Sequence, residues 1–206
     1  MEDIGVYEHQ ADETVDSPFF AMVSRMKYIN RWALMRNSYQ ENISEHSLEV
    51  AMLAHALALI GNHRYGHRLN AERAALIGMY HDCTEIITGD MPTPVKYYNE
   101  ETRNAYQRVE EEAAKKLLSM LPEYLREEYE GFFFRQDEDA YLWKLVKAAD
   151  RLSAYIKCVE EEKTGNREFL NAKAVIYEKL TQMDLPEVRT FLRDFGASYK
   201  KTLDEL

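Results

Sequence analysis

The chain has 206 residues, of which 46% are hydrophobic and 30% are charged, and its formal net charge is −10. This length and balance predict one soluble globular domain and exclude a disordered chain. The negative charge works against a broad nucleic-acid or anionic-membrane surface, because both need clustered Lys and Arg. We therefore expect no polymeric nucleic acid and no membrane among its partners, whereas a small phosphate ester needs only a bound cation and one well-placed Arg.

The two cysteines, Cys83 and Cys158, have no paired spacing. The sequence therefore indicates neither a disulfide framework nor a zinc knuckle. The N-terminus lacks the apolar segment of a signal peptide, and we expect no later stretch to reach the length of a membrane span. Together these features predict a cytoplasmic protein.

An acidic segment opens the chain. Residues 1–17 are rich in Asp and Glu and lack apolar periodicity, which predicts a flexible leader. Pro18 suits the first position of a helix, because its fixed φ angle matches the helix and its missing N–H is not needed there. We therefore expect the folded domain to span residues 18–206.

The first long helix is predicted to start after Ser44, whose side chain can cap it. Residues 46–60 have an amphipathic pattern, and the pair Gly61-Asn62 is typical of a helix end. His46 then lies in the first turn of this helix. We expect residues 62–69 to form a polar loop.

A second helix is predicted over residues 71–89, with Asn70 as its cap. It would carry His81, Asp82 and Glu85. On a helix, His81 and Glu85 are four residues apart and lie one above the other, while Asp82 is rotated by about 100°. All three side chains can therefore border one pocket.

The segment 90–94 contains two prolines, so we expect it to be extended or turned. The rest of the chain has charged and amphipathic patterns typical of helices, with Pro122 as an interruption. These predicted helices cover residues 95–121, 137–163, 168–182 and 186–204. No segment shows a sustained period of two, and the sequence predicts an all-α fold, a single helical bundle.

Two histidines and two aspartates suggest a metal centre: His46, His81, Asp82 and Asp150. Imidazole and carboxylate groups hold borderline divalent ions, and four such ligands leave room for water or substrate. Asp150 is the most informative of the four, because its apolar and small neighbours predict a largely buried helix, where an unpaired carboxylate is costly. The alternative for Asp150 is a buried salt bridge with a nearby Lys or Arg.

These four residues, in this order and on predicted helices, resemble the metal-binding signature of the HD-domain phosphohydrolases. Longer stretches resemble, more narrowly, the bacterial 5′-deoxynucleotidases of the YfbR type: residues 24–32, 41–48, 79–82 and 88–97. The likeness runs from about residue 18 nearly to the C-terminus. It implies an all-helical homodimer that removes phosphate from deoxyribonucleoside 5′-monophosphates with many different bases.

The resemblance also implies one divalent metal ion per subunit, with cobalt and manganese as the first candidates. The same ligands accept zinc, copper or iron. The metal ligands implied are the four residues named above, His46, His81, Asp82 and Asp150.

The resemblance gives Arg31 the task of orienting the phosphate and Trp32 a contact with the sugar. Without it, residue chemistry favours a surface pair at a helix end, with Trp32 packed into the core. Glu85, on the same helix face as His81, is placed to deprotonate the attacking water as general base. The substrate-binding residues expected are Arg31, Trp32, Asp82, Asp90, Met91, Pro92, Thr93 and Asp150.

Two other functions remain open. One is a different HD-type enzyme, such as a guanosine-tetraphosphate hydrolase or a cyclic-nucleotide phosphodiesterase. Such hydrolases commonly carry a Glu-Asp pair after the signature, whereas Ile86 follows Glu85 here. The other is a noncatalytic helical binding protein that keeps a metal for stability, which Glu85 and Arg31 disfavour because a structural ion needs closed coordination.

Overall fold

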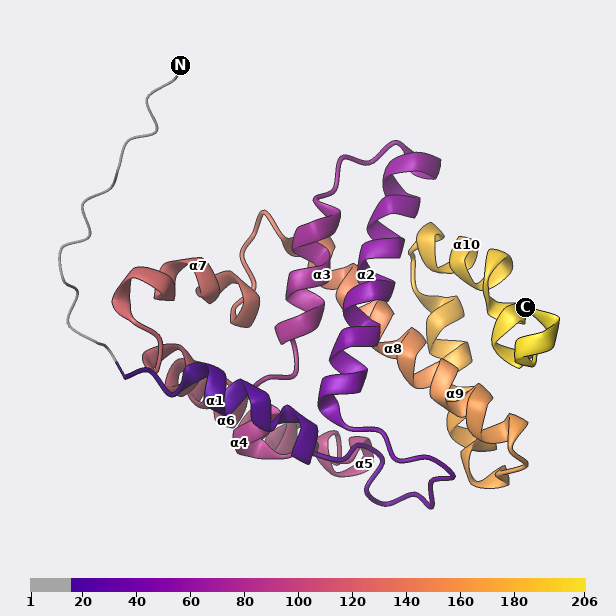
Figure 1. Ribbon diagram of the computed structural model, residues 1–206, viewed down its shortest axis with the longest axis horizontal. Coiled ribbons are helices and arrows are strands. Elements are labelled where there is room, and N and C mark those ends of the chain that lie inside the picture. Colours follow the sequence, from indigo (N-terminus) through magenta and orange to yellow (C-terminus); the bar gives the residue numbers. More distant parts are fainter. Residues whose placement is uncertain (1–15) are drawn as a thin grey trace.

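The computed structural model describes residues 16–206, which form helices joined by connections, the longest of them between Tyr28 and Ile43 (Figure 1). Within that range β pairing is limited to one isolated bridge between Asn30 and Asn42, and the all-α prediction is confirmed. The predicted leader lies outside the described residues apart from Asp16 and Ser17. The Ser17 hydroxyl donates a hydrogen bond to the Met120 carbonyl (2.6 Å), which attaches this end of the predicted leader to the fold.

Over residues 16–206 the helices follow one another with four 3₁₀ turns between or after them. The α-helices are α1 Phe19–Val23, α2 Ile43–Tyr65, α3 Ala71–Tyr80, α4 Glu85–Thr88, α5 Thr93–Lys96, α6 Glu100–Ser119, α7 Glu123–Phe133, α8 Ala140–Lys163, α9 Leu170–Gln182 and α10 Pro186–Asp194. The 3₁₀ turns are η1 Ser24–Tyr28, η2 Arg167–Phe169, η3 Gly196–Lys200 and η4 Leu203–Glu205. The predicted helix 186–204 thus ends as an α-helix at Asp194.

Helices α2, α3 and α8 form the centre of the fold, with α9 and α10 on one side and α1, α6 and α7 on the other (Figure 1). The main apolar core lies between the three central helices and includes Leu57, Ile77 and Leu152, all fully buried. A second cluster around Phe19 and Leu117 lies between α1, α6 and the start of α2. The first turn of α2 and the end of α3 therefore lie at the boundary between the main core and this second cluster.

Helix α2 is long and apolar enough, by length and composition alone, to cross a membrane, so the expectation that no stretch reaches that length is wrong. Half of its apolar window is nevertheless buried inside the fold. Its buried side chains, such as Val50 and Leu57, belong to the main core. The central helix of a globular core has this composition because neighbours cover it on several faces.

The ends of α2 differ from the prediction. Asn42, not Ser44, caps the helix: its side chain accepts the Glu45 N–H (3.1 Å), and Glu45 accepts the Asn42 N–H (3.3 Å). The helix continues through Gly61 to Tyr65, and Gly66 caps its end with a φ of 71°. A β-carbon at Gly61 would lie 3.0 Å from a side chain on α10, so this glycine allows close helix packing and does not end the helix.

The predicted helix 71–89 is broken. It ends as α3 at Tyr80, a turn follows, and α4 starts at Glu85. The turn directs Cys83 into the second apolar cluster, while Ile77 on α3 belongs to the main core. Packing against two clusters outweighs helix continuity here, and His81 and Glu85 do not stand one above the other on one helix.

The proline segment is partly helical. Residues 89–92 have no regular structure, as expected, but Thr93 starts the short helix α5. Pro94 lies in its first turn, where a backbone N–H is not needed. The expectation of an extended or turned segment is therefore wrong for Thr93 and Pro94.

Candidate metal centre

The four predicted ligands converge from three places in the fold. His46 lies in the first turn of α2, His81 and Asp82 in the turn after α3, and Asp150 in the middle of α8. The His46 Nε2 atom is 3.3 Å from Asp150 Oδ1 and 3.4 Å from Asp82 Oδ2. The His81 Nε2 atom is 3.1 Å from Asp82 Oδ2. One ligand atom each from His46, His81 and Asp150 lies within 4.8 Å of the others.

The donor atoms of this cluster fit a divalent ion. The Nε2 atoms of His46 and His81 are buried and have no hydrogen-bond partner within residues 16–206. Buried polar atoms are nearly always paired, so two such nitrogens facing carboxylates fit the binding of a cation. Two imidazoles with carboxylate oxygens form a donor set that suits zinc, manganese, cobalt or iron.

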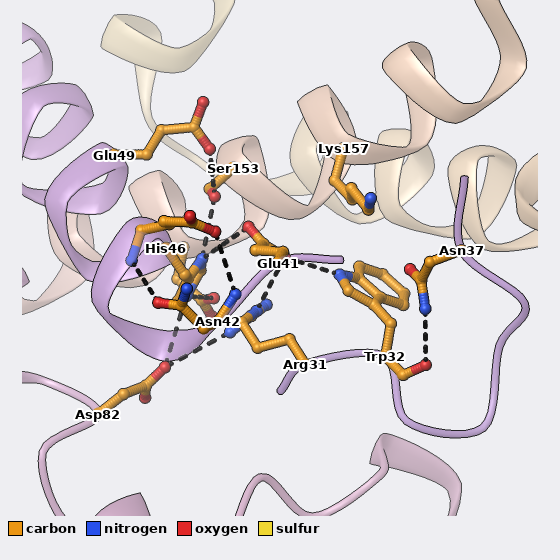
Figure 2. Close-up of polar contacts among 12 residues, drawn as sticks. Arg31, Trp32, Asn37, Glu41, Asn42, His46, Glu49, Asp82, Ser153 and Lys157 are labelled. Carbon is orange, nitrogen blue, oxygen red and sulfur yellow. Dashed lines mark hydrogen bonds and ion pairs between the residues drawn. The ribbon is translucent and has the colours of Figure 1, made fainter. Parts of the chain in front are cut away.

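Hydrogen bonds on the far side of each imidazole determine which nitrogen faces the cluster. The Gly78 carbonyl lies 2.7 Å from His81 Nδ1, and a carbonyl can only accept, so Nδ1 carries the proton. The His46 Nδ1 atom is 3.0 Å from Ser153 Oγ, whose hydroxyl proton goes to Glu49 Oε2 (2.5 Å). Ser153 Oγ must then accept from His46; Figure 2 draws both contacts of this hydroxyl. Both Nε2 atoms are left as free lone pairs.

The charges of the cluster favour ionised carboxylates. Burial alone would raise the pKa of Asp82, but His81 and His46 outweigh burial and hold that pKa well below its usual range. Burial likewise raises the pKa of Asp150, and the adjacent His46 imidazole outweighs burial and brings that pKa below its usual value. Burial lowers the pKa of His81, whereas Asp82 beside it produces a net rise. A proton on His81 thus competes with a metal ion for the same nitrogen.

Glu85 lies next to the cluster in an environment that keeps it neutral. It is buried, and its Oε2 atom has no hydrogen-bond partner among the described residues. Burial, with the charges of Asp82 and Asp90, raises the pKa of Glu85 to about 10, although Arg31 and Lys96 act in the opposite direction. A cation added to the cluster would lower this pKa, because it stabilises the ionised carboxyl.

Arg31 and Trp32 are held together by Glu41. The Glu41 carboxylate accepts hydrogen bonds from Arg31 Nε (3.2 Å) and from Trp32 Nε1 (3.0 Å), as Figure 2 shows. Arg31 also lies 3.5 Å from Asp82 Oδ2, so its guanidinium borders the cluster. The surface-pair alternative is therefore wrong: the Arg31 side chain is only 11% exposed. The linking role of Glu41 was missed by sequence reasoning.

The backbone at Trp32 is unusual. Its φ angle is 59°, in the left-handed region that bulky residues rarely adopt. Such a conformation persists only where surrounding contacts hold it, and it is often found at functional sites. Here the indole is held by Glu41 and by an edge contact with the Phe169 ring, with centroids 5.3 Å apart.

A buried ion pair on α8 anchors the loop that ends in Glu41. The Lys157 ammonium donates to Glu161 (2.5 Å) and to the Tyr39 carbonyl. The Glu161 carboxylate also accepts the backbone N–H groups of Ser38 (2.9 Å) and Tyr39 (3.4 Å). A Lys and a Glu four residues apart are usually a solvated pair on a helix surface, so the sequence does not reveal this role.

The predicted substrate loop meets the cluster through Asp90. Burial raises the pKa of Asp90, the Arg31 charge opposes this rise, and the Trp32 backbone also lowers it. Met91 is half-buried, whereas Thr93 is exposed. Within the described residues, Thr93 has no side-chain hydrogen bond to the cluster, and the structure thus brings only part of this predicted set together.

Comparisons with known proteins identify relatives over most of this chain. A family model described as 5′-deoxynucleotidase YfbR-like matches residues 18–199. A Vibrio vulnificus protein named 5′-deoxynucleotidase is 49% identical over 191 residues, covering 93% of this chain and 98% of that protein. An Erwinia tasmaniensis protein of the same name is 50% identical over 192 residues, with coverages of 93% and 97%.

Solved structures with lower identity share the fold. An HD-domain phosphohydrolase from Listeria innocua superposes with a TM-score of 0.77 and 21% identity, covering 88% of this chain and 87% of that one. A cyanophage S-2L HD phosphohydrolase, bound to dA and one catalytic Zn²⁺, gives a TM-score of 0.62 and 22% identity, with coverages of 94% and 100%. On the match over residues 18–199 and the relatives near 50% identity, the chain belongs to the YfbR-like 5′-deoxynucleotidase family.

Proposed function

We propose that this chain is a metal-dependent 5′-deoxynucleotidase, which hydrolyses deoxyribonucleoside 5′-monophosphates to deoxyribonucleosides and phosphate. The observation that carries the proposal is the buried cluster with two unpartnered imidazole nitrogens and adjacent carboxylates. It occurs in a chain whose relatives, 49% and 50% identical over 93% of its length, are named 5′-deoxynucleotidases.

One divalent ion would be held by His46, His81, Asp82 and Asp150. Such an ion polarises a phosphate oxygen and lowers the pKa of a bound water. Cobalt and manganese are the ions proposed first, while zinc, copper and iron also suit imidazole and carboxylate ligands. The catalytic Zn²⁺ of the cyanophage phosphohydrolase supports a divalent ion without deciding which one.

Arg31 is the residue proposed to orient the phosphate. Its guanidinium fork matches the geometry of phosphate oxygens. Glu41 fixes one side of that fork through Nε (3.2 Å), and Nη1 points toward Asp82 (3.5 Å). Trp32, oriented by the same Glu41 carboxylate, would contact the sugar.

Glu85 is the proposed general base. The water oxygen would bond to phosphorus as the bond from phosphorus to the 5′-oxygen breaks, and Glu85 would take the proton that the water loses. The 5′-oxygen would take a proton from solvent as it leaves, and Glu85 would return its proton to solvent. Glu85 can do this only when its pKa falls from about 10, so the positive charge at the cluster and the basicity of Glu85 are coupled.

The loop after α4 would select the sugar. Asp90, half-buried beside Arg31, would accept a hydrogen bond from the 3′-hydroxyl. Met91, Pro92 and Thr93 would complete a pocket shaped for deoxyribose. A 2′-hydroxyl would clash there or be buried without a partner, and either outcome disfavours ribonucleotides.

A homodimer in the cytoplasm is also proposed. An apolar stripe on the outer face of α2, formed by Leu48, Met52 and Leu59, is exposed by 54%, 59% and 37%. These positions share one helix face, and association would cover them. The two cysteines are buried and unbridged, which agrees with a reducing compartment.

The test is phosphate release from matched deoxyribo- and ribonucleoside 5′-monophosphates. Chelated protein is reloaded in parallel with cobalt, manganese, zinc or magnesium. Metal-dependent release confined to the deoxy series is expected. Equal release from both series would remove the sugar-selection argument, and no release from either series would refute the proposed activity.

A further inference from the structure

A cavity of about 440 Å³ adjoins the metal centre. His81 and Asp150, two of the proposed ligands, form part of its lining, and three basic residues form another part: Arg135, Lys144 and Lys147. Lys147 lies one turn before Asp150 on α8, and Arg135 lies in the connection between α7 and α8. One opening therefore combines basic side chains with metal ligands.

The three basic side chains are exposed and free to bind an anion. Within residues 16–206, Arg135, Lys144 and Lys147 take part in no ion pair. Other basic side chains near the core are each paired with a carboxylate: Arg31, Arg73, Lys96 and Lys157. Trp143 lines the same cavity, and its indole N–H is buried without a partner among the described residues. The cavity thus offers positive charge that is not taken up by ion pairs among the described residues.

This local charge contrasts with the whole molecule. A protein with a formal net charge of −10 repels an anion at long range. A phosphate monoester carries a charge of about −1.5 to −2 at neutral pH. Three cations around one opening would offset this repulsion locally, within roughly one Debye length, about 10 Å at moderate salt. Arg31 cannot serve this purpose, because its side chain is 11% exposed and is bound to Glu41.

We propose that Arg135, Lys144 and Lys147 form an anion-capture rim, through which the phosphate of the nucleotide reaches the metal centre. The identity of the anion rests on the proposed function, whereas the binding of phosphate at the rim does not. The rim attracts the dianion from solvent, and the buried Arg31 then orients it. The two sets of cations therefore act on different steps, capture and positioning.

The test compares two triple variants with the same change in net charge. The rim variant is R135Q/K144Q/K147Q. The control variant is R108Q/K116Q/K179Q, which removes three exposed cations on α6 and α9 that form no ion pair among the described residues. For each holoenzyme, kcat/KM for deoxyadenosine 5′-monophosphate is measured from low to high salt. The affinity for inorganic phosphate is measured separately by calorimetry.

The rim variant is expected to lose about tenfold in kcat/KM at low salt, mainly through KM, and to show a flatter salt dependence. Its affinity for inorganic phosphate falls as well, while the control variant behaves like the wild type. Wild-type salt dependence and phosphate affinity in the rim variant would overturn the inference, as would equal losses in both variants. One outcome separates the two proposals. If neither the wild type nor either variant hydrolyses the nucleotide, and the rim variant alone binds phosphate weakly, the proposed activity is refuted and the anion-capture rim is supported.

Discussion

Ser153→Ala is expected to weaken metal binding without touching a proposed ligand. The Ser153 side chain is fully buried, and its hydroxyl joins His46 Nδ1 (3.0 Å) to Glu49 (2.5 Å). The substitution leaves the His46 Nδ1–H without its acceptor. The imidazole then loses the contact that directs Nε2 toward Asp82 and Asp150.

The expected loss of stability follows from the two hydrogen bonds that the substitution removes. A hydrogen bond to a charged group contributes about 1.5–3 kcal/mol, and a neutral one about 0.5–1.5 kcal/mol. The metal-free protein should therefore lose about 2–4.5 kcal/mol of unfolding free energy. Groups that orient a metal ligand typically change metal affinity by about 10–100-fold, so the variant should bind its ion more weakly by a factor in that range.

Ser47→Ala is the matched control. Ser47 lies on α2 and, like Ser153 on α8, is a buried serine, with 2% of its surface exposed. Its hydroxyl, however, has no hydrogen-bond partner within the described residues. Its loss should leave metal affinity and stability close to wild type. Affinity is measured by competition with a chelator, and stability by urea unfolding of the metal-free proteins. Equal metal affinity in Ser153→Ala, Ser47→Ala and the wild type would refute the argument for the hydroxyl.

Three further outcomes are expected. In chelated protein the folded pKa of Glu85, about 10, exceeds the value of about 4.3 for an unfolded carboxyl. The folded state then holds more protons between these values, so the unfolding free energy falls as pH rises, and Glu85→Gln should flatten that fall in a thermal-melting series. Asp150→Asn should lower metal affinity by more than about 100-fold, because it removes a ligand and not merely a supporting group. If competition with a chelator gives this variant a metal affinity near that of the wild type, Asp150 is excluded as a ligand. Lys157→Met leaves the buried Glu161 carboxylate without its counter-ion and should cost about 3–5 kcal/mol in urea unfolding. Adding Glu161→Gln should recover most of this loss, and a double variant as unstable as the single one would contradict this pairing.

Much of the helical fold is predictable from local patterns. Asn70 was predicted to cap the second helix, and its side chain does accept the Arg73 N–H (2.9 Å). The boundaries that differ depend on contacts distant in sequence. Gly61 looks like a helix end until α10 packs against it, and the helix break after Tyr80 depends on an apolar cluster that includes Phe19. No local pattern contains that information.

In the candidate site, too, some features are predictable from local sequence and others depend on contacts distant in sequence. Ligand-type residues stand out in the sequence because they interrupt apolar helices, and His46, His81, Asp82 and Asp150 come together as expected. The groups that orient them do not stand out. Ser153 and Glu49 are 104 residues apart, and an ordinary serine and glutamate on two helices carry no signal of a shared hydrogen bond.

The distribution of the four ligands over α2, the turn after α3 and α8 has a consequence for folding. The unfolded chain offers no assembled site, because the ligands come together only when these three segments have packed. An ion that binds the native state alone stabilises it by mass action, with an energy that grows with the logarithm of ion concentration. Metal supply would then adjust the fraction of chain that is folded, and the abundance of this protein would follow the ion it uses.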